Sequence, residues 1–242
     1  EKMKTSKQLV EYVRRKAAEP KTIYVLGSFG QILTQEFLNQ KCRQLTWNEQ
    51  NRSILQQYVN QGYQAFDCCG LIKAFLWDDN PSNYKVAEDE NEATMLARAK
   101  VKGKIGTMPE RPGILVFMSG HVGVYVGDGE VVECTPSEAL GGWGVLTTKL
   151  KDRGWTDWAE YARINYDKPA GWQQADGCWF YYLDGTMLKG WRWLPVSNGS
   201  DVWGWFYFNP ANGIMQSNKW VRFTDGQEYE LGKNGKWTGN HK

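Results

Sequence analysis

The sequence predicts two regions of different fold class: an α+β domain over residues 1–167 and an all-β domain of repeated hairpins over residues 168–242. In the first region, helix-like spacing of apolar residues comes first and strand-like alternation follows Pro112. The second region is under a third of the chain, yet it holds eight of the thirteen tryptophans. Aromatic residues favour strands, so this change in composition marks a change in architecture.

Helices are predicted near the start of the chain. Residues 5–20, TSKQLVEYVRRKAAEP, can be capped by Thr5 or Ser6 and end at Pro20. Residues 31–45 and 48–62 also show helical spacing, and the latter segment ends at a glycine. Residues 113–118, GILVFM, and 121–126, HVGVYV, are typical of strands.

The second region repeats itself. The segments WFYYLDGTMLKGW, at 179–191, and WFYFNPANGIMQSNKW, at 205–220, are two copies of one pattern separated by the insert LPVSNGSDV. Asx-Gly pairs, which favour tight hairpin turns, punctuate the region at 176–177, 184–185, 198–199, 212–213, 225–226 and 234–235. A single hairpin is marginally stable in water, so we expect successive hairpins to stack as a short solenoid.

Charge and composition exclude several classes of protein. The net charge is +2, with 7 basic and 6 acidic residues from residue 171 onward and 22 and 21 before it, so neither region resembles a nucleic-acid-binding domain. No apolar run reaches the roughly 18 residues of a membrane span, and no secretory signal is visible. Five scattered cysteines are too few for a disulfide framework and favour synthesis in a reducing cytoplasm.

The stretch FDCCGLIKAFLW, residues 66–77, places two adjacent cysteines at the start of an apolar, helix-like run. We expect Asp67 to be the N-cap of this helix. A thiol in the first turn has its pKa lowered by the helix dipole, and a nearby imidazolium lowers it further. One of these cysteines is therefore a candidate nucleophile.

The chain has only two histidines, and His121 is the one that is not at the C-terminus. Strand alternation puts His121 on the face opposite Val122, with Cys134 on the valine face as a core residue. A three-residue loop at 127–129 would set 126 opposite 130 and 123 opposite 133, so Glu133 lies diagonal to His121 and within its reach. A nucleophile, a base and a polar orienting group form the set that a cysteine hydrolase needs.

These motifs resemble those of the NlpC-type cell-wall peptidases, which are papain-like in fold. FDCCGLIKAF is similar to their F-D-C-S-G-L motif, and GHVGVYVGDGEVVE to their histidine segment. The resemblance, over roughly residues 20–165, implies that Cys68 is the nucleophile, His121 the base and Glu133 the orienting residue. It places Cys69 at the family's serine position and makes Tyr24, in YVLGSFG, a candidate substrate-binding residue.

The tail has a second resemblance. GWQQADGCWFYYLDGTMLKGW is similar to the choline-binding type of cell-wall repeat, whose aromatic cages hold choline or related wall groups. The positions that match its aromatic residues are Trp172, Trp179, Tyr181, Trp191, Trp205, Tyr207 and Trp220. We expect the insert after Trp193 to leave only one or two intact cages. The repeats could also form a homodimer.

Together, the two resemblances imply a peptidoglycan hydrolase of the phage endolysin or autolysin kind. It would cut a stem-peptide amide, either a D-γ-glutamyl bond or the muramoyl–L-alanine bond, without metal or cofactor. With no visible signal peptide, we expect it to be made in the bacterial cytoplasm and to act on the wall after release.

Other interpretations stay open at this point. The first region could be inactive, which would make the chain a wall-binding adhesin, or it could transfer acyl groups with the same cysteine–histidine pair. The cysteines could be core residues, Glu133 a solvated strand residue and Tyr24 plain packing. A zinc site from Cys68, Cys69, His121 and Cys134 is conceivable by count, although strand parity turns Cys134 away.

Overall fold

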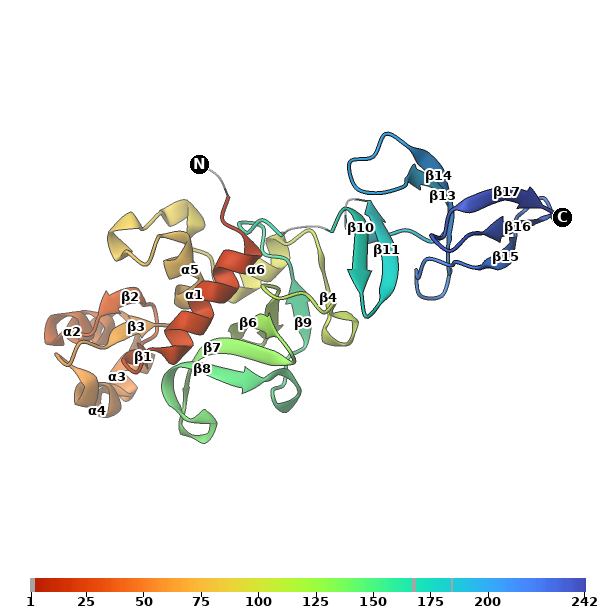
Figure 1. Cartoon of the computed structure of the whole chain (residues 1–242). Coiled ribbons are helices and arrows are strands. Elements are labelled where there is room, and N and C mark those ends of the chain that lie inside the picture. The colour runs from red at the N-terminus through yellow and green to blue at the C-terminus, as the bar shows by residue number, and fades with distance from the viewer. Residues whose placement is uncertain (1–2, 167–168, 184) are drawn as a thin grey trace. The chain divides into compact units, whose positions relative to one another are not determined.

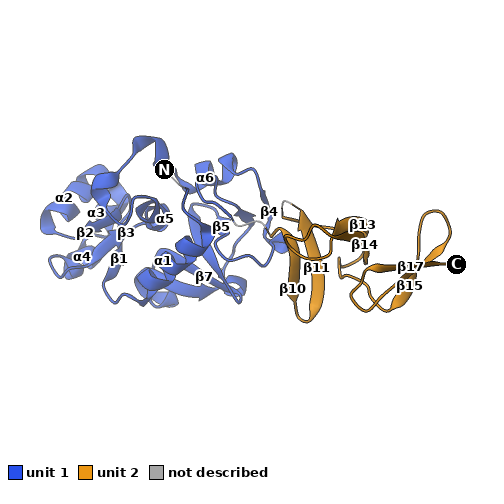
Figure 2. Ribbon diagram, turned by 45° about the horizontal axis from the view of Figure 1, so that its top comes forward, with its two compact units in different colours: residues 1–166 blue, residues 167–242 orange. Residues whose placement is uncertain are grey.

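The structure is a computed structural model that describes residues 3–166, 169–183 and 185–242. The chain divides into two compact units, residues 1–166 and residues 167–242 (Figures 1 and 2). The first unit mixes helices and sheets, and the second consists of small antiparallel sheets. Within the described residues, no helix is both long and apolar enough to cross a membrane.

The first unit contains short helices around one longer N-terminal helix. Their bounds are α1 (Ser6–Ala18), α2 (Gln35–Gln44), α3 (Thr46–Gln50), α4 (Arg52–Leu55), α5 (Cys68–Leu76) and α6 (Glu92–Arg98). Single 3₁₀ turns occupy Gln56–Tyr58, Pro81–Asn83, Val86–Glu88, Ile105–Thr107, Glu138–Leu140 and Leu150–Asp152. Thr5 caps α1 in a capping box with Gln8, which confirms the predicted start.

The helix predicted over residues 48–62 is wrong in its extent. The chain instead forms α3, α4 and a 3₁₀ turn, with Asn51 between the first two. The Asn51 side chain donates to the carbonyl oxygen of Trp47 at 2.8 Å. Such side chain–backbone bonds compete with helix continuation, which periodicity alone does not reveal.

The larger sheet of the first unit is antiparallel and positions most of the candidate site. Its strands are β4 (Lys102–Lys104), β5 (Leu115–Met118), β6 (His121–Gly127), β7 (Glu130–Ser137), β8 (Gly142–Lys149) and β9 (Asp157–Ala159), in the order β4-β9-β5-β6-β7-β8. Helices α1 and α5 pack against each other and against β6 and β7 (Figure 1). The N-terminus of α5 therefore reaches the strands that carry His121 and Glu133.

The β6–β7 hairpin has the predicted register in its body but not at its turn. Val124 pairs with Val132, as the alternation predicted. Gly127 rather than Val126 pairs with Glu130, through a bulge. The turn is thus tighter than the predicted three-residue loop, with Asp128 at a φ of 54°.

A smaller sheet joins β1 (Thr22–Tyr24), β3 (Gln64–Phe66) and β2 (Phe29–Ile32) in the order β1-β3-β2. Strands β1 and β3 are parallel, and Tyr24 is paired with Phe66. Because α5 begins two residues after Phe66, this pairing carries Tyr24 to the start of the cysteine helix.

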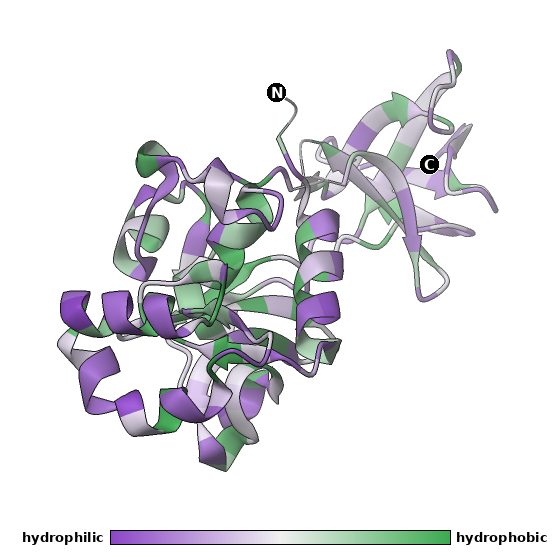
Figure 3. Ribbon diagram, turned by 90° about the vertical axis from the view of Figure 1, so that its left-hand side faces the viewer, coloured by the Kyte–Doolittle hydropathy of each residue, from purple (hydrophilic) through white to green (hydrophobic). Residues whose placement is uncertain are grey.

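The first unit has a continuous apolar core between α1, α5 and the larger sheet. Leu9, Val13, Ile72, Val116 and Val124 are each at most 1% exposed. Figure 3 shows hydrophobic segments on the interior strands, whereas the outward turns of several helices are hydrophilic. Each such side chain contributes about 1.5–3 kcal/mol when fully buried, so this core holds α5 rigidly against the sheet.

The second unit is built from antiparallel hairpins, as the repeats predicted. Its strands are β10 (Gly171–Ala175), β11 (Cys178–Leu183), β12 (Thr186–Met187), β13 (Gly190–Pro195), β14 (Trp203–Phe208), β15 (Lys219–Arg222), β16 (Glu228–Leu231) and β17 (Trp237–His241). They form the sheets β10-β11-β12, β13-β14 and β15-β16-β17. The insert lengthens the β13–β14 hairpin without interrupting its pairing, which runs from Gly190 opposite Phe208 to Pro195 opposite Trp203.

Asx-Gly pairs mark the turns of the second unit in two ways. At Asp176–Gly177 both residues have positive φ, 48° and 74°, as a two-residue hairpin turn requires. At Asn234–Gly235 only the glycine does, and the asparagine side chain instead accepts a bond from the Lys236 N–H at 3.2 Å. The pair containing Asp184 lies partly outside the described residues.

Adjacent hairpins share a small core. Trp172, Leu194, Phe206 and Phe208 are at most 8% exposed and pack together. The rings of Trp172 and Phe206 meet edge to face, with centroids 4.8 Å apart. The aromatic repeat therefore buries one face of each hairpin and leaves other rings for pockets.

Candidate functional site

The start of α5 is held by Asp67, which is its N-cap as predicted. One carboxylate oxygen of Asp67 accepts from the Gly70 N–H at 2.5 Å and the other from the Gly27 N–H at 2.8 Å. The Asp67 N–H donates to the carbonyl oxygen of Ser28 at 3.0 Å. A Cβ at Gly70 would lie 1.8 Å from that same oxygen, so only glycine fits beneath this loop.

Burial and the neighbouring Cys68 charge raise the pKa of Asp67 to about 6, against the opposing effects of Lys73 and the two N–H donors. Two residues of the D-C-C-G motif thus have structural roles: Asp67 caps the helix, and Gly70 leaves room for the carbonyl of Ser28.

Cys68 and His121 influence each other's pKa, because the charge of each favours the charged form of the other. The Cys69 thiol, whose sulfur lies 4.0 Å from that of Cys68, acts together with His121 and the Val122 N–H to hold the pKa of Cys68 well below its usual range, although burial opposes this. A thiolate paired with an imidazolium is the form that these contacts favour.

Glu133 contacts His121 through one ring nitrogen. Its Oε2 lies 2.6 Å from His121 Nε2, so Nδ1 is the ring nitrogen that is not bound to Glu133. Burial alone would lower the pKa of His121, but hydrogen bonds to Cys68 and Glu133 raise it to about 9. With a pKa of about 9 the ring is doubly protonated at neutral pH, and its Nε2–H donates to Glu133.

The Glu133 carboxylate is completely buried and has two further partners that the sequence did not reveal. Thr148 donates to Oε1 at 2.6 Å, and Arg153 donates through Nε to Oε1 at 2.9 Å and through Nη2 to Oε2 at 2.8 Å. Burial raises the pKa of Glu133, yet the bonds from His121, Arg153 and Thr148 lower it to about 2.

Trp155 is another site residue that sequence reasoning missed. Its ring stacks on His121 with centroids 5.6 Å apart and planes 15° apart, and its buried indole N–H has no acceptor among the described residues. A Cβ at Gly123 would lie 3.0 Å from this ring. The glycine of the H-V-G motif was a usable signal, since it leaves room for a large neighbour.

The other two cysteines near the site differ from Cys68. Cys69 Sγ lies 4.0 Å from Cys68 Sγ and 3.9 Å from Glu92 Oε2. Its bond to Cys68 and its burial raise the pKa of Cys69 above the usual range. Cys134 is fully buried and donates to the Phe66 carbonyl oxygen at 3.4 Å, and burial raises its pKa as well.

The zinc alternative finds no support in this arrangement. Across residues 3–166, 169–183 and 185–242, no group of three or more His, Cys, Asp or Glu side chains is arranged to hold a metal ion.

Tyr24 belongs to the same core cluster as Cys68 despite the long separation in sequence. It is 8% exposed and packs edge to face on Trp47 with centroids 5.3 Å apart. Burial and the Cys68 charge raise the pKa of Tyr24 above its usual range, so the phenol is neutral.

The second unit has an aromatic pocket of about 210 Å³. Its walls are Trp191, Trp205, Phe223, Tyr229 and Trp237, with no charged side chain among them. Only Trp191 and Trp205 were predicted from the sequence. The other three follow Trp220, where the second copy of the repeat ends and the spacing of the aromatic residues changes.

A larger pocket of about 520 Å³ contains the predicted residues Trp172 and Trp179. Phe206 and Met215 add apolar walls, and Lys233 adds a charge. The two pockets therefore differ in chemical character.

The remaining predicted aromatic residues do not line either pocket. Tyr181 packs on Trp172 at 5.2 Å between centroids, and Tyr207 packs on Trp191 at 5.3 Å. Trp220 is 38% exposed, with Lys242 Nζ 4.4 Å from its ring centroid.

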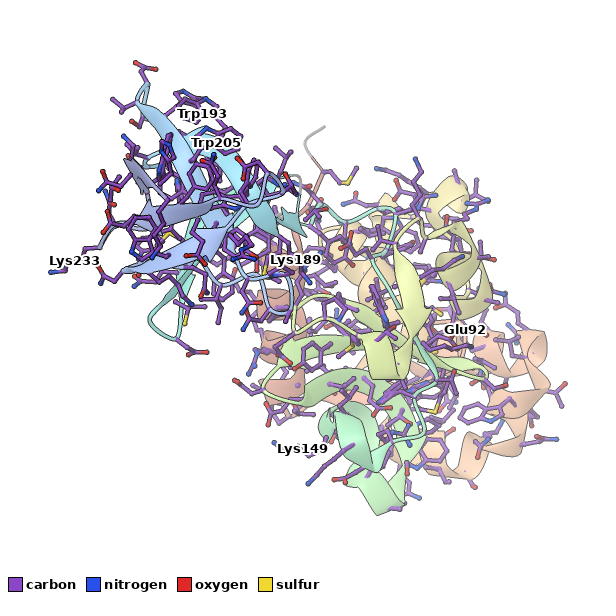
Figure 4. The ribbon with its side chains drawn as sticks, turned by 90° about the vertical axis from the view of Figure 1, so that its right-hand side faces the viewer. Glu92, Lys149, Lys189, Trp193, Trp205 and Lys233 are labelled. Atoms are coloured by element: carbon purple, nitrogen blue, oxygen red, sulfur yellow. The ribbon has the colours of Figure 1, made fainter. Side chains whose placement is uncertain are left out.

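Trp193 and Trp205 lie together on the surface of this unit (Figure 4), with centroids 5.7 Å apart.

The pKa directions predict that Cys68 reacts with iodoacetamide at about pH 5.5, because it is then already a thiolate. In a Cys178→Ser background, which removes the one cysteine that is not buried, His121→Ala should slow this alkylation about tenfold or more, since one pKa unit changes the thiolate fraction tenfold. Mass spectrometry of the labelled peptide measures the rate. Equal rates in both proteins, or labelling of Cys69 instead, would contradict the assignment.

No family model and no curated relative matches the sequence. Similar solved structures include the choline binding domain of Spr1274 in Streptococcus pneumoniae, at 34% identity and a TM-score of 0.24, covering 30% of this chain and 97% of that one. CbpJ from Streptococcus pneumoniae TIGR4 has 29% identity and a TM-score of 0.24, with 34% and 25% covered. NlpC1 from Trichomonas vaginalis has 15% identity and a TM-score of 0.37, with 64% and 45% covered. The chain is thus similar, each time over part of its length, to choline-binding domains and to an NlpC protein.

Proposed function

We propose that the protein is a cysteine hydrolase that cuts an amide bond of the peptidoglycan stem peptide. The observation that carries this proposal is the set Cys68, His121 and Glu133, with Cys68 in the first turn of a helix. The imidazole lies 2.6 Å from a fully buried carboxylate, and the charges of Cys68 and His121 lower the pKa of the thiol and raise that of the imidazole. We further propose a papain-like fold for the first unit, because a cysteine helix packs on the antiparallel strands that carry the histidine.

In the acylation step, the Cys68 thiolate attacks the carbonyl carbon of the amide and forms a C–S bond. The negative charge moves to the carbonyl oxygen. The N–H groups of Cys68 and Cys69, in the first turn of α5, have no acceptor within the helix and are the candidate donors to that oxygen. When the tetrahedral intermediate collapses, the C–N bond breaks and His121 gives its Nδ1 proton to the leaving amine.

In the deacylation step, neutral His121 takes one proton from water, and the resulting hydroxide attacks the thioester carbonyl. The C–S bond breaks, which restores the Cys68 thiolate beside the His121 imidazolium, and the carboxylic acid product releases the second water proton to solvent and leaves as a carboxylate. Glu133 holds the imidazole in one orientation through both steps and stays ionised. Tyr24, a neutral phenol in the same core cluster as Cys68, is the proposed contact for the substrate chain.

The tail is the reason for proposing a wall substrate. An uncharged aromatic pocket fits a quaternary ammonium such as choline, because ring faces attract cations and a quaternary ammonium has no N–H group that needs an acceptor. The walls of this pocket are Trp191, Trp205, Phe223, Tyr229 and Trp237. Each ring would contribute about 0.5–2 kcal/mol. Such a site binds in the millimolar range, at about −4 kcal/mol, so retention needs several sites on one polymer.

The larger pocket is a second candidate wall-binding site. Trp172 and Trp179 offer ring faces there, while Lys233 and Asn234 make it more polar than the first pocket. For the bond that is cut, the D-γ-glutamyl link and the muramoyl–L-alanine link remain the two candidates.

Cys68→Ala should abolish the release of muropeptides from purified walls of Gram-positive bacteria while leaving wall binding intact, because the acyl-enzyme can no longer form. Cys69→Ala, the comparison one residue away, should lower activity by far less, because it removes a partner of the Cys68 sulfur but not the nucleophile. Mass spectrometry of the released fragments measures both variants and identifies the bond. Undiminished release by Cys68→Ala would reject the hydrolase.

Trp205→Ala should weaken the retention of the protein on walls, and choline should release the protein that is retained. In the full-length Cys68→Ala protein, which does not damage the wall, choline at about 10–50 mM should elute the bound protein, whereas ethanolamine should not. The Trp205→Ala change should lower choline affinity about 2- to 30-fold, as expected for one ring. Trp220→Ala, a tryptophan outside both pockets, is the control.

If choline elutes nothing while the protein still binds walls, the pockets recognise another wall group. If the full-length protein binds no wall, the proposed targeting role is wrong.

A further inference from the structure

We propose that Arg153 is a positioning residue that locks Glu133 in line with His121 and limits how strongly this glutamate holds the imidazole proton. Its effect on turnover rests on the proposed hydrolase function, but its effect on the Cys68–His121 pair does not.

The first argument is the geometry of the carboxylate. Arg153 donates to both oxygens of Glu133, at 2.9 and 2.8 Å, which fixes the plane of the group. Each oxygen then has one more donor: Thr148 at Oε1 and His121 at Oε2. Glu133 therefore cannot rotate without breaking several bonds, and its own side chain has no exposed surface.

The second argument is that Arg153 also touches the group stacked on the imidazole. Its guanidinium carbon lies 5.7 Å from the Trp155 ring centroid, and Trp155 stacks on His121. Apart from Cys68, the two side chains that hold the histidine ring are thus Glu133 and Trp155. Arg153 contacts both of them.

The third argument is the balance of charge. The groups that face His121 and Glu133 are Cys68, from α5, and Arg153, which follows the 3₁₀ turn Leu150–Asp152. Asp67 and Cys69 lie behind Cys68. An unshared buried carboxylate would bind a protonated imidazole more tightly than one already paired with a permanent cation.

Removal of the Arg153 charge should therefore raise the pKa of His121, so that the imidazolium survives to higher pH. A residue that served only to hold the fold together would reduce activity without moving this titration in that direction.

The test is the pH profile of Cys68 alkylation by iodoacetamide in the full-length Cys178→Ser protein. The rate should rise a second time when His121 loses its proton, since a thiolate freed from its imidazolium partner is the better nucleophile. Arg153→Met should move this second rise upward by about half a pH unit or more. Arg153→Lys keeps the charge but loses the two-pronged hydrogen bonding to both oxygens of Glu133. The pH of the second rise in alkylation rate should therefore stay near that of the parent protein.

Arg163→Met is the matched control. Arg163 also pairs with a buried glutamate, Glu90, through Nε at 3.3 Å and Nη2 at 2.9 Å, but its contacts do not include His121 or Glu133. This variant should leave the second rise where it is in the parent protein, even if thermal stability falls.

On walls, Arg153→Met should lower the rate of muropeptide release roughly 10- to 100-fold, as expected when a catalytic group loses its alignment. Arg153→Lys should recover part of that loss. An unchanged or lowered second rise in Arg153→Met would overturn the proposal. If the parent protein releases nothing from walls, the hydrolase function fails, yet the alkylation profile still decides the role of Arg153.

Discussion

The buried carboxylate of Glu133 is the constraint on which the candidate site depends. It has no exposed surface and accepts hydrogen bonds from His121, Thr148 and Arg153. A buried ion is stable only when it is paired and its oxygens are satisfied. Glu133 in turn stabilises an imidazolium, which stabilises the Cys68 thiolate at the start of α5. The site is therefore one connected set of charges rather than three independent side chains.

Much of this arrangement could be predicted from local patterns. Alternation along residues 121–134 put His121 and Glu133 on one face, and the capping preference of Asp67 placed Cys68 in the first turn of a helix. Arg153 could not be found this way, because it follows an irregular segment whose path is set by tertiary packing. The pairing that brings Tyr24 opposite Phe66 could not be predicted either, since parallel pairing between β1 and β3 leaves no signal in sequence spacing.

In the tail, the repeats predicted hairpins and aromatic pockets but only part of the pocket walls. Trp191 and Trp205 stand in clear copies of the repeat, whereas Phe223, Tyr229 and Trp237 follow the last of these copies, where the pattern fades. Some of the matched rings, such as Tyr181 and Tyr207, pack on neighbouring tryptophans instead. Aromatic spacing identifies the architecture, but packing between hairpins decides which rings line a pocket.

The central claim is that His121 is an imidazolium paired with the Cys68 thiolate before any substrate binds. The most direct measurement is a ¹⁵N NMR titration of the imidazole nitrogens, which is simple to assign because His241 is the only other histidine. We expect both His121 nitrogens to stay protonated through neutral pH, with a pKa of about 9, and this value to fall in Cys68→Ala. A neutral His121 at pH 7 in the unmodified protein would contradict the account.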